Sequence, residues 1–248
     1  MDEIYSMKTI LRLFPYLDNK AKAQKLKIDE DSIHYISIRE HADQITEIIT
    51  KYTQFLKIKP NNIVITDATA GVGGNTISFG SRFRQVNSIE IEELRAGYLK
   101  NNIGVYNLDN VNVINGDYTK IYGNLTQHVV FIDPPWGGKS YKDHKNLKLD
   151  LSGIPIETIC NNLLERSDNT YLIVLKLPNN YDIKYLFTQV TSKTIYLHEL
   201  KKMFILVIVN TKFDLTSFNL SNVKSPDYRS INKLDTSNIK HHVNTLIN

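Results

Sequence analysis

The chain has 248 residues, of which 42% are hydrophobic, and a formal net charge of +4 at pH 7. This length suits one α/β domain with extensions, and the hydrophobic content is enough for a core. No apolar run approaches the ~20 residues that span a bilayer, and the acidic start of the chain is unlike a signal peptide. We therefore expect an intracellular protein of the cytoplasm or nucleus, with no membrane partner.

The first 56 residues are predicted to form a helical N-terminal extension. Helical spacing of apolar residues covers Met7–Tyr16, Lys20–Lys27 and Arg39–Phe55. In the third of these segments the apolar positions are Ala42, Ile45, Ile48, Ile49 and Tyr52. Lys59-Pro60 then breaks the chain, which places the start of the main domain near residue 57.

Seven apolar runs follow, and most of them are separated by helical segments. The runs are Ile63–Thr66, Gln85–Ile89, Val111–Asn115, His128–Ile132, Tyr171–Leu175, Thr194–Leu197 and Phe204–Val209. The helical segments are Asn75–Arg82, Glu92–Tyr106, Pro155–Arg166 and Tyr181–Thr188. This alternation predicts βαβ units with right-handed crossovers and a mostly parallel sheet.

The last two runs are joined by His198–Met203, which is too short for a crossover helix, so we expect these strands to pair antiparallel. Seven strands with an antiparallel last strand form the pattern of the Rossmann-like class I methyltransferase fold, which would cover residues 57–210. Residues 211–248 are predicted to be a polar C-terminal tail, with a short helix over Ile239–Ile247. The single cysteine, Cys160, excludes an internal disulfide and is predicted to be a small core residue.

A glycine-rich loop follows the first strand, with the sequence Asp67-Ala68-Thr69-Ala70-Gly71-Val72-Gly73-Gly74-Asn75-Thr76. Glycines let the backbone turn sharply and approach a ligand, and ligands of open α/β sheets bind outside the carboxyl ends of the strands. We expect Asn75 or Thr76 to cap the following helix. Ile77 replaces the last glycine of the dinucleotide-binding pattern and no Gly-Lys-Ser/Thr follows, which argues against a dinucleotide fingerprint and against a phosphate-binding P-loop.

Acidic residues end the next two strands. Glu90 follows Gly71 by about 20 residues, where a carboxylate can accept hydrogen bonds from both hydroxyls of a ribose. Asp117, at the end of the third strand, could accept from an adenine amino group, and Asp67 would meet the amino-acid end of the ligand. The ligand that fits best is S-adenosylmethionine, with S-adenosylhomocysteine as the product, and no metal is expected. The predicted cofactor-binding residues are Asp67, Ala68, Gly71, Gly73, Asn75, Thr76, Glu90, Asp117 and Tyr118.

The sequence Asp133-Pro134-Pro135-Trp136 follows the fourth strand. Prolines have a fixed φ and no N–H, so their carbonyls can be held toward a ligand, and the chain's only tryptophan offers a flat face. Together with a carboxylate, these groups suit the exocyclic amine of a planar base, which they would orient and make more electron-rich. We predict catalytic roles for Asp133, Pro134 and Trp136. The alternative is a tight Pro-Gly turn with Trp136 as a core residue.

Two runs of this chain, Asp67–Ile77 and Pro134–Tyr141, resemble the trimethylguanosine synthase family, whose members methylate N2 of the 7-methylguanosine cap of RNA. The similarity extends from about Arg12 to Val209. The resemblance implies conversion of 7-methylguanosine to 2,7-dimethylguanosine on capped RNA, not on DNA, and leaves a second methylation open. We expect a compact, monomeric enzyme of RNA capping and mRNA processing, which in a large DNA virus would work in the viral factory.

By the same resemblance, Trp136 stacks on the cationic 7-methylguanine ring, where a cation–π contact adds ~0.5–2 kcal/mol. The Pro134 carbonyl and the Asp133 carboxylate would receive the N2 hydrogens. Ser37 would line the pocket, because its segment resembles the family's pocket wall. The predicted substrate-binding residues are Trp136, Ser37, Lys139, Lys142, Asn179 and Arg12, with Lys8 and Lys176 as further candidates for the cap phosphates.

Two positions depart from the family pattern. Family members commonly carry serine or another small residue at the position of Asp133, and Asn179 replaces a basic residue. The first alternative function is an N6-adenine methyltransferase acting on RNA or DNA, because Asp-Pro-Pro-Trp is the sequence motif expected of such enzymes. Gly137-Gly138 and Ile36-Ser37 favour the cap enzyme. The second alternative is a catalytically silent cap-binding module.

Overall fold

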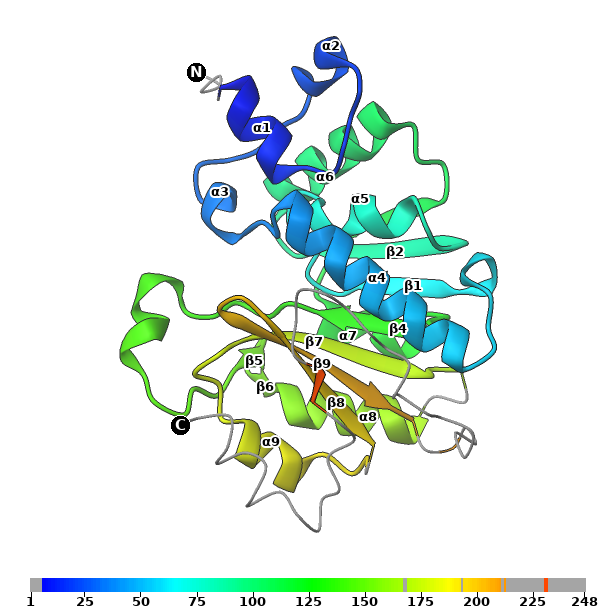
Figure 1. The fold of residues 1–248 in the computed structure, drawn as a ribbon, viewed down its shortest axis with the longest axis vertical. Coiled ribbons are helices and arrows are strands. Elements are labelled where there is room, and N and C mark those ends of the chain that lie inside the picture. The colour runs from blue at the N-terminus through cyan, green and yellow to red at the C-terminus, as the bar shows by residue number, and fades with distance from the viewer. Residues whose placement is uncertain (1–5, 167–168, 193, 211, 213–229, 232–248) are drawn as a thin grey trace. The chain divides into compact units, whose positions relative to one another are not determined.

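The computed structural model describes residues 6–166, 169–192, 194–210, 212 and 230–231 (Figure 1). These residues belong to two compact units, Met1–Gln127 and His128–Asn248. The predicted helix over Ile239–Ile247 and most of the predicted tail lie outside the described residues. Within the described part of the chain, no helix combines the length and the hydropathy that crossing a bilayer requires.

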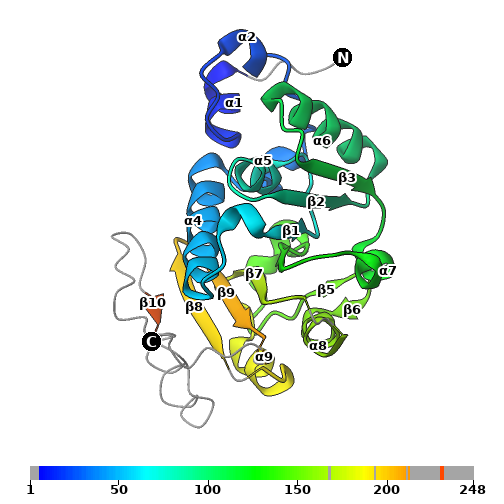
Figure 2. The ribbon, with the colours of Figure 1, turned by 90° about the vertical axis from the view of Figure 1, so that its right-hand side faces the viewer.

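The first unit is built on three parallel strands. β1 (Val64–Asp67) pairs with β2 (Gln85–Glu90), and β2 pairs with β3 (Val111–Asn115). Figure 2 shows α6 (Glu93–Tyr106) running along β3. The other helices and 3-10 turns of this unit are α1 (Met7–Leu13), α2 (Lys20–Ala23), α3 (Ser32–Tyr35), α4 (Arg39–Phe55), η1 (Pro60–Asn62), α5 (Gly74–Gly80), α7 (Tyr118–Ile121) and η2 (Tyr122–Asn124).

The first helix is shorter than the sequence predicted. α1 begins after Ser6, whose side-chain oxygen accepts a hydrogen bond from the backbone N–H of Thr9 at 3.2 Å. It ends at Leu13, and Phe14 is already extended, with φ −96° and ψ 154°. Pro15 explains this end, because a proline disfavours helical dihedrals in the residue before it.

The fourth helix has the predicted bounds. α4 buries the predicted apolar residues, which recur every three or four positions and therefore lie on one face. These residues are Ala42, Ile45, Ile48, Ile49 and Tyr52. The same face contacts α5 through a hydrogen bond of 2.7 Å between the Thr46 and Ser78 hydroxyls.

A buried asparagine ties the N-terminal segment to the rest of the first unit. Asn102 of α6 is fully buried, and its amide nitrogen donates to the carbonyls of Val72 (2.9 Å) and Lys27 (2.8 Å). Its amide oxygen accepts from the N–H of Lys27 at 2.8 Å. Tyr106, one turn further along α6, donates its hydroxyl to the Pro15 carbonyl at 2.5 Å. One apolar cluster joins both parts, with Ile10, Leu13, Phe14, Ala23, Ala70, Val72, Ile77, Leu99 and Ile103.

The second unit contains the other four predicted strands. β4 (Val129–Ile132) pairs parallel with β7 (Leu172–Pro178). β9 (Met203–Val209) lies between β7 and β8 (Ile195–Leu200) and is antiparallel to both. All seven predicted strands are therefore present, and the prediction of an antiparallel last strand is confirmed.

Several short elements of the second unit were not predicted. β5 (Asp150–Leu151) and β6 (Ile154–Pro155) pair antiparallel, and β10 (Ser230–Ile231) pairs antiparallel with β8. Strands of two residues carry no hydrophobic period, so the sequence pattern does not reveal them. The helices and turns of this unit are η3 (Gly138–Asp143), α8 (Ile156–Arg166) and α9 (Ile183–Gln189). Cys160 of α8 is fully buried, which confirms the prediction of a core residue.

Replacing Gly74 by alanine is expected to lower the free energy of unfolding by about 1–3 kcal/mol, because overpacking displaces neighbouring atoms. A Cβ at this position would lie 2.7 Å from Ile36 Cγ1 and 2.7 Å from the Ser37 carbonyl oxygen. Urea titration measures the change. Gly97→Ala is the matched control, because a Cβ there meets nothing within 4 Å, and stability should stay unchanged or rise by up to ~1 kcal/mol. Equal stability of the two variants would contradict the close approach.

Candidate active site

Two glycines with positive φ shape the loop after β1. Gly71 has φ +53° and Gly73 has φ +108°, a region that residues with a Cβ rarely adopt. Gly73 is also the N-cap of α5, and no side chain caps this helix. The expectation that Asn75 or Thr76 caps the helix is therefore wrong, because both residues lie inside its first turn.

Asn75 and Thr76 make tertiary hydrogen bonds instead. The Thr76 hydroxyl donates to Asp67 Oδ2 at 2.7 Å, and Asp67 is only 1% exposed, so the start of α5 is tied to the end of β1. The Asn75 amide nitrogen donates to the Ser37 hydroxyl at 3.0 Å. Asn75, predicted for the cofactor, and Ser37, predicted for the substrate, are thus in direct contact.

The Glu90 carboxylate holds the glycine loop in place. Its Oε2 accepts from the N–H of Gly71 at 2.8 Å, and its Oε1 accepts from the N–H of Glu92 at 2.9 Å. An ionised carboxylate has about four acceptor sites, so each oxygen can accept one further hydrogen bond. The structure therefore assigns Glu90 a role in shaping the loop, in addition to the predicted role in ligand binding.

Asp117 and Tyr118 follow β3, at the start of α7, but differ in exposure, because Asp117 is partly exposed and Tyr118 is buried. Asp117 caps α7, with its Oδ1 accepting from the N–H and the hydroxyl of Thr119 at 2.9 and 2.7 Å. Tyr118 is 2% exposed, and its hydroxyl donates to Gln127 Oε1 at 3.3 Å. Its ring packs against that of Tyr122, so the structure places Tyr118 in the core of the first unit.

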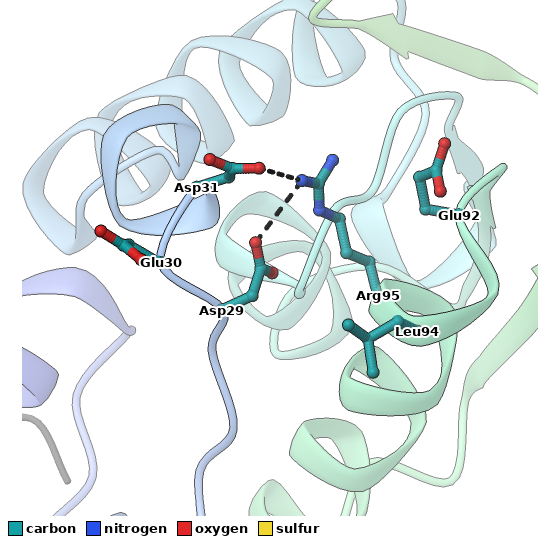
Figure 3. A pocket seen from close by; sticks show the side chains of 6 residues that line it. All are labelled: Asp29, Glu30, Asp31, Glu92, Leu94 and Arg95. Atoms are coloured by element: carbon teal, nitrogen blue, oxygen red, sulfur yellow. Dashed lines mark hydrogen bonds and ion pairs between the residues drawn. The ribbon is translucent and has the colours of Figure 1, made fainter. Parts of the chain in front are cut away.

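An acidic hollow of about 300 Å³ opens near the end of β2 (Figure 3). Arg95 points between Asp29 and Asp31 and pairs with both, in each case at 3.4 Å. Burial alone would raise the pKa of Asp29, but hydrogen bonds from Ser32 and the charge of Arg95 outweigh it and hold that pKa below its usual value. The lining residues are Asp29, Glu30, Asp31, Glu92, Leu94 and Arg95. Sequence reasoning missed this group, because Asp29 and Arg95 are 66 residues apart.

The predicted acceptor residues follow β4 in the second unit. Pro134 is buried, and Trp136 is partly exposed, so Trp136 is not the core residue of the alternative interpretation. Gly137 and Gly138 have φ +90° and +68°, which places both in the left-handed region that favours glycine. Tyr141 in the following η3 turn packs edge-on against Trp136, with 5.2 Å between the ring centres. Sequence reasoning did not identify Tyr141 as part of this site.

Asp133 is paired with a buried lysine. Lys176 Nζ lies 2.5 Å from Asp133 Oδ2 and 5.4 Å from the centre of the Trp136 ring. Burial raises the pKa of Asp133 above its usual value, and the neighbouring Lys176 opposes that shift. Lys176 was a candidate for a cap phosphate, and the structure places its ammonium on this carboxylate.

A cavity of about 280 Å³ adjoins Trp136. Asn180 holds the loop beside it, because its amide nitrogen donates to the carbonyls of Tyr141 (2.7 Å) and His144 (2.8 Å). Lys139, Lys142 and Asn179 of this unit are exposed, as is Arg12 of the first unit. The lining residues are Pro135, Trp136, Gly137, Ser140, Tyr141, His144, Leu147, Lys148, Leu149 and Asp150.

Residues 62–240 match the family model described as RNA cap guanine-N2 methyltransferase. Protein L320 of Acanthamoeba polyphaga mimivirus is 37% identical over 224 residues, which cover 83% of this chain and 86% of that protein. The trimethylguanosine synthase of Schizosaccharomyces pombe is 32% identical over 131 residues, which cover 50% of this chain and 53% of the synthase. The chain thus matches about half the length of the yeast enzyme.

Among solved structures, a T. thermophilus 16S rRNA N2 methyltransferase in complex with AdoMet and guanosine has a TM-score of 0.52 to this chain. The two are 12% identical, and the match covers 74% of this chain and 43% of that one. This likeness confirms the predicted Rossmann-like methyltransferase fold. With the match to the family model over most of its length, the chain belongs to the RNA cap guanine-N2 methyltransferase family.

Proposed function

We propose that this chain transfers a methyl group from S-adenosylmethionine to the exocyclic N2 of 7-methylguanosine in capped RNA. The observation that carries the proposal is the partly exposed Trp136, which ends the Asp133-Pro134-Pro135-Trp136 sequence and lines a cavity. Family membership and the similarity to a trimethylguanosine synthase support it. The first transfer would give 2,7-dimethylguanosine, and a second would give 2,2,7-trimethylguanosine.

The first unit has a donor and acceptor set that fits S-adenosylmethionine. Glu90 is oriented by two backbone N–H groups and keeps acceptor sites for the ribose hydroxyls. Ile91, directly after it, is 56% exposed and offers an apolar face to an adenine ring. The side-chain oxygen of Asn75 is buried and has no hydrogen-bond partner among the described residues, so a donor on the ligand would satisfy it.

Bound S-adenosylmethionine supplies a methyl group activated by the neighbouring sulfonium. The Pro134 carbonyl and the Asp133 carboxylate would accept the two hydrogens of the amine and direct its lone pair toward that methyl carbon. A C–N bond would form as the C–S bond of the donor breaks and leaves S-adenosylhomocysteine, and the nitrogen, acidic once it carries the methyl group, would then release a proton to solvent. Most of the catalysis is therefore orientation and electrostatic stabilisation by fixed groups, without a strong base.

Trp136 would select the methylated cap over unmodified guanine. The 7-methylguanine ring carries a positive charge, and a cation over an indole ring gains ~0.5–2 kcal/mol beyond ordinary stacking. An unmethylated guanine lacks that contribution. Exposed Lys139 and Lys142 follow the ring closely in sequence and would contribute positive charge for the cap phosphates.

One observation favours a second function, N6-adenine methylation of RNA or DNA. The Asp133 carboxylate is a strong acceptor for an adenine amino group, and it stands where cap enzymes commonly carry a small residue. Against this reading, a neutral adenine ring would not use the cation–π energy that Trp136 offers. A silent cap-binding module is disfavoured by the intact arrangement of Gly71, Gly73 and Glu90.

The partner we propose is capped RNA, with neither DNA nor a membrane, and the enzyme would act as a monomer. The mimivirus relative supports a viral setting, in which the chain would modify caps where viral mRNA is made inside the infected cell. The domain arrangement we propose is a helical extension over residues 1–56, a catalytic domain over 57–210 and a tail over 211–248.

A methyl-transfer assay with three acceptors tests the function. The acceptors are 7-methyl-GDP, GDP and an adenine-containing oligonucleotide, each with labelled S-adenosylmethionine. We expect label in 7-methyl-GDP, little in GDP and none in adenine. Chromatography of the products separates one from two N2 methylations. Label in adenine alone would contradict the cap function and support N6-adenine methylation. No label in any acceptor would favour a catalytically silent cap-binding module.

Glu90→Gln is expected to weaken the binding of S-adenosylhomocysteine at least tenfold, ~1.5–3 kcal/mol, the range for hydrogen bonds to a charged group. The amide would place a donor against one of the two N–H groups that the carboxylate now accepts. Isothermal titration calorimetry measures the affinity. Glu93→Gln, an exposed glutamate at the start of α6, is the control and should bind as the unchanged protein does. Equal affinities of the two variants would remove Glu90 from the cofactor site.

Trp136→Ala is expected to abolish nearly all methylation of 7-methyl-GDP while far-UV circular dichroism stays unchanged. Loss of a stacking ring costs ~1–3 kcal/mol in binding, and the amine is then no longer held in place. Trp136→Phe should retain part of the activity, because phenylalanine stacks but gives a weaker cation–π contact. If Trp136→Ala kept its activity, the tryptophan would not be the platform for the base.

A further inference from the structure

The acceptor residues contain an ion pair that the sequence pattern did not reveal. Ile132 of β4 lies opposite Leu175 of β7, so the next residues of these two parallel strands, Asp133 and Lys176, are neighbours. Their charged atoms are 2.5 Å apart, and the same ammonium lies 5.4 Å from the centre of the Trp136 ring. The side chains of Lys176 and Asp133 are 6% and 16% exposed, so water screens this pair little.

Each member of this pair depends on the other for its charge. β7 is buried at all seven residues, and Lys176 is the one charged residue in its sequence Leu-Ile-Val-Leu-Lys-Leu-Pro. A buried ammonium is costly unless a carboxylate compensates it, and the same holds for the Asp133 carboxylate. Removing one partner of such a pair therefore disturbs a protein more than removing both.

We propose that Lys176 is a positioning residue of the acceptor site, which acts by holding Asp133 ionised and fixed to receive the hydrogens of the acceptor amine. The inference rests on the proposed function for the identity of that amine. An ionised carboxylate only accepts hydrogen bonds, whereas a protonated one presents an O–H donor. By keeping Asp133 ionised, Lys176 ensures that the carboxylate accepts hydrogen bonds from the amine and does not present an O–H donor to it.

A second consequence concerns substitutions at Asp133. Serine at this position would leave the Lys176 ammonium buried without its carboxylate, so Asp133→Ser alone is not a clean test of the carboxylate. Methionine resembles lysine in length and carries no charge, so Asp133→Ser combined with Lys176→Met removes both charges at once. Asp133 and Lys176 are therefore one functional unit.

The test is a double-mutant cycle, with kcat and KM for 7-methyl-GDP measured in the unchanged protein, Lys176→Met, Asp133→Ser and the double variant. We expect Lys176→Met alone to lower kcat at least ~10-fold, with KM changed less than about threefold. In the Asp133→Ser background, the same substitution should change kcat less than about twofold or raise it. Lys202→Met is the control, because Lys202 is exposed in the turn between β8 and β9, and it should behave as the unchanged protein. Losses that simply multiply would overturn the proposal.

A second comparison separates positioning from a direct contact with a phosphate. The same variants are assayed with 7-methylguanosine, which has no phosphate, and with 7-methyl-GDP. A positioning role predicts the same fold loss for Lys176→Met with both acceptors. A loss confined to the diphosphate would make Lys176 a phosphate ligand and overturn the proposal.

Two arms keep this inference separate from the proposed function. If the three-acceptor assay labels adenine and not the cap, the cap assignment fails, and the cycle is run on the adenine acceptor to test Lys176 by itself. If Lys176→Met does not fold, the double variant is compared with Asp133→Ser, and lower activity of the double variant overturns the proposal.

Fluorescence of the single tryptophan tests the contact without any acceptor. We expect the emission to shift in folded Lys176→Met, because the ammonium near the ring is gone. An unchanged emission would contradict the contact.

Discussion

The candidate cofactor site depends on one carboxylate that is bound at both of its oxygens. Glu90 accepts hydrogen bonds from the N–H of Gly71 and from the N–H of Glu92. Gly71 has the positive φ at which the loop turns, and Glu92 lies just before α6 begins. Hydrogen bonds to a charged group contribute ~1.5–3 kcal/mol each, more than neutral ones. The loop after β1 and the turn after β2 therefore take their shapes from the same side chain, and the residue proposed to bind the ribose also builds the surface around it.

The acceptor residues of the second unit are held in place by backbone turns, hydrogen bonds and ring packing. Gly137 and Gly138 turn the chain sharply after Trp136, and Asn180 then fixes the returning loop through two carbonyls. Tyr141 packs edge-on against the indole ring and limits its rotation. A site that works by orientation needs its groups to be rigid before the ligand arrives, and these contacts supply that rigidity.

The parts of this fold that sequence could predict are those with a local pattern. Apolar runs predicted the seven strands, and the acidic residues at strand ends included Glu90 and Asp133. The glycine loop and the tryptophan motif carried the family resemblance. Helix capping at Asn75 was wrong because Gly73, with its positive φ, already ends the turn. The pairs Asp29–Arg95 and Asp133–Lys176 span 66 and 43 residues, and no spacing rule links residues that meet only through strand register or tertiary packing.

Three hydrogen bonds that Asn102 makes to backbone groups give the first unit a thermodynamic link between distant segments. One buried amide satisfies both backbone groups of Lys27 and the carbonyl of Val72, inside the glycine loop. Neither segment can open without leaving buried polar groups unpaired, which is costly. Hydrogen exchange at Lys27 and at the glycine loop should therefore report one shared opening event. Displacing Lys27 from Asn102 would consequently loosen a loop that lies 45 positions further along the chain.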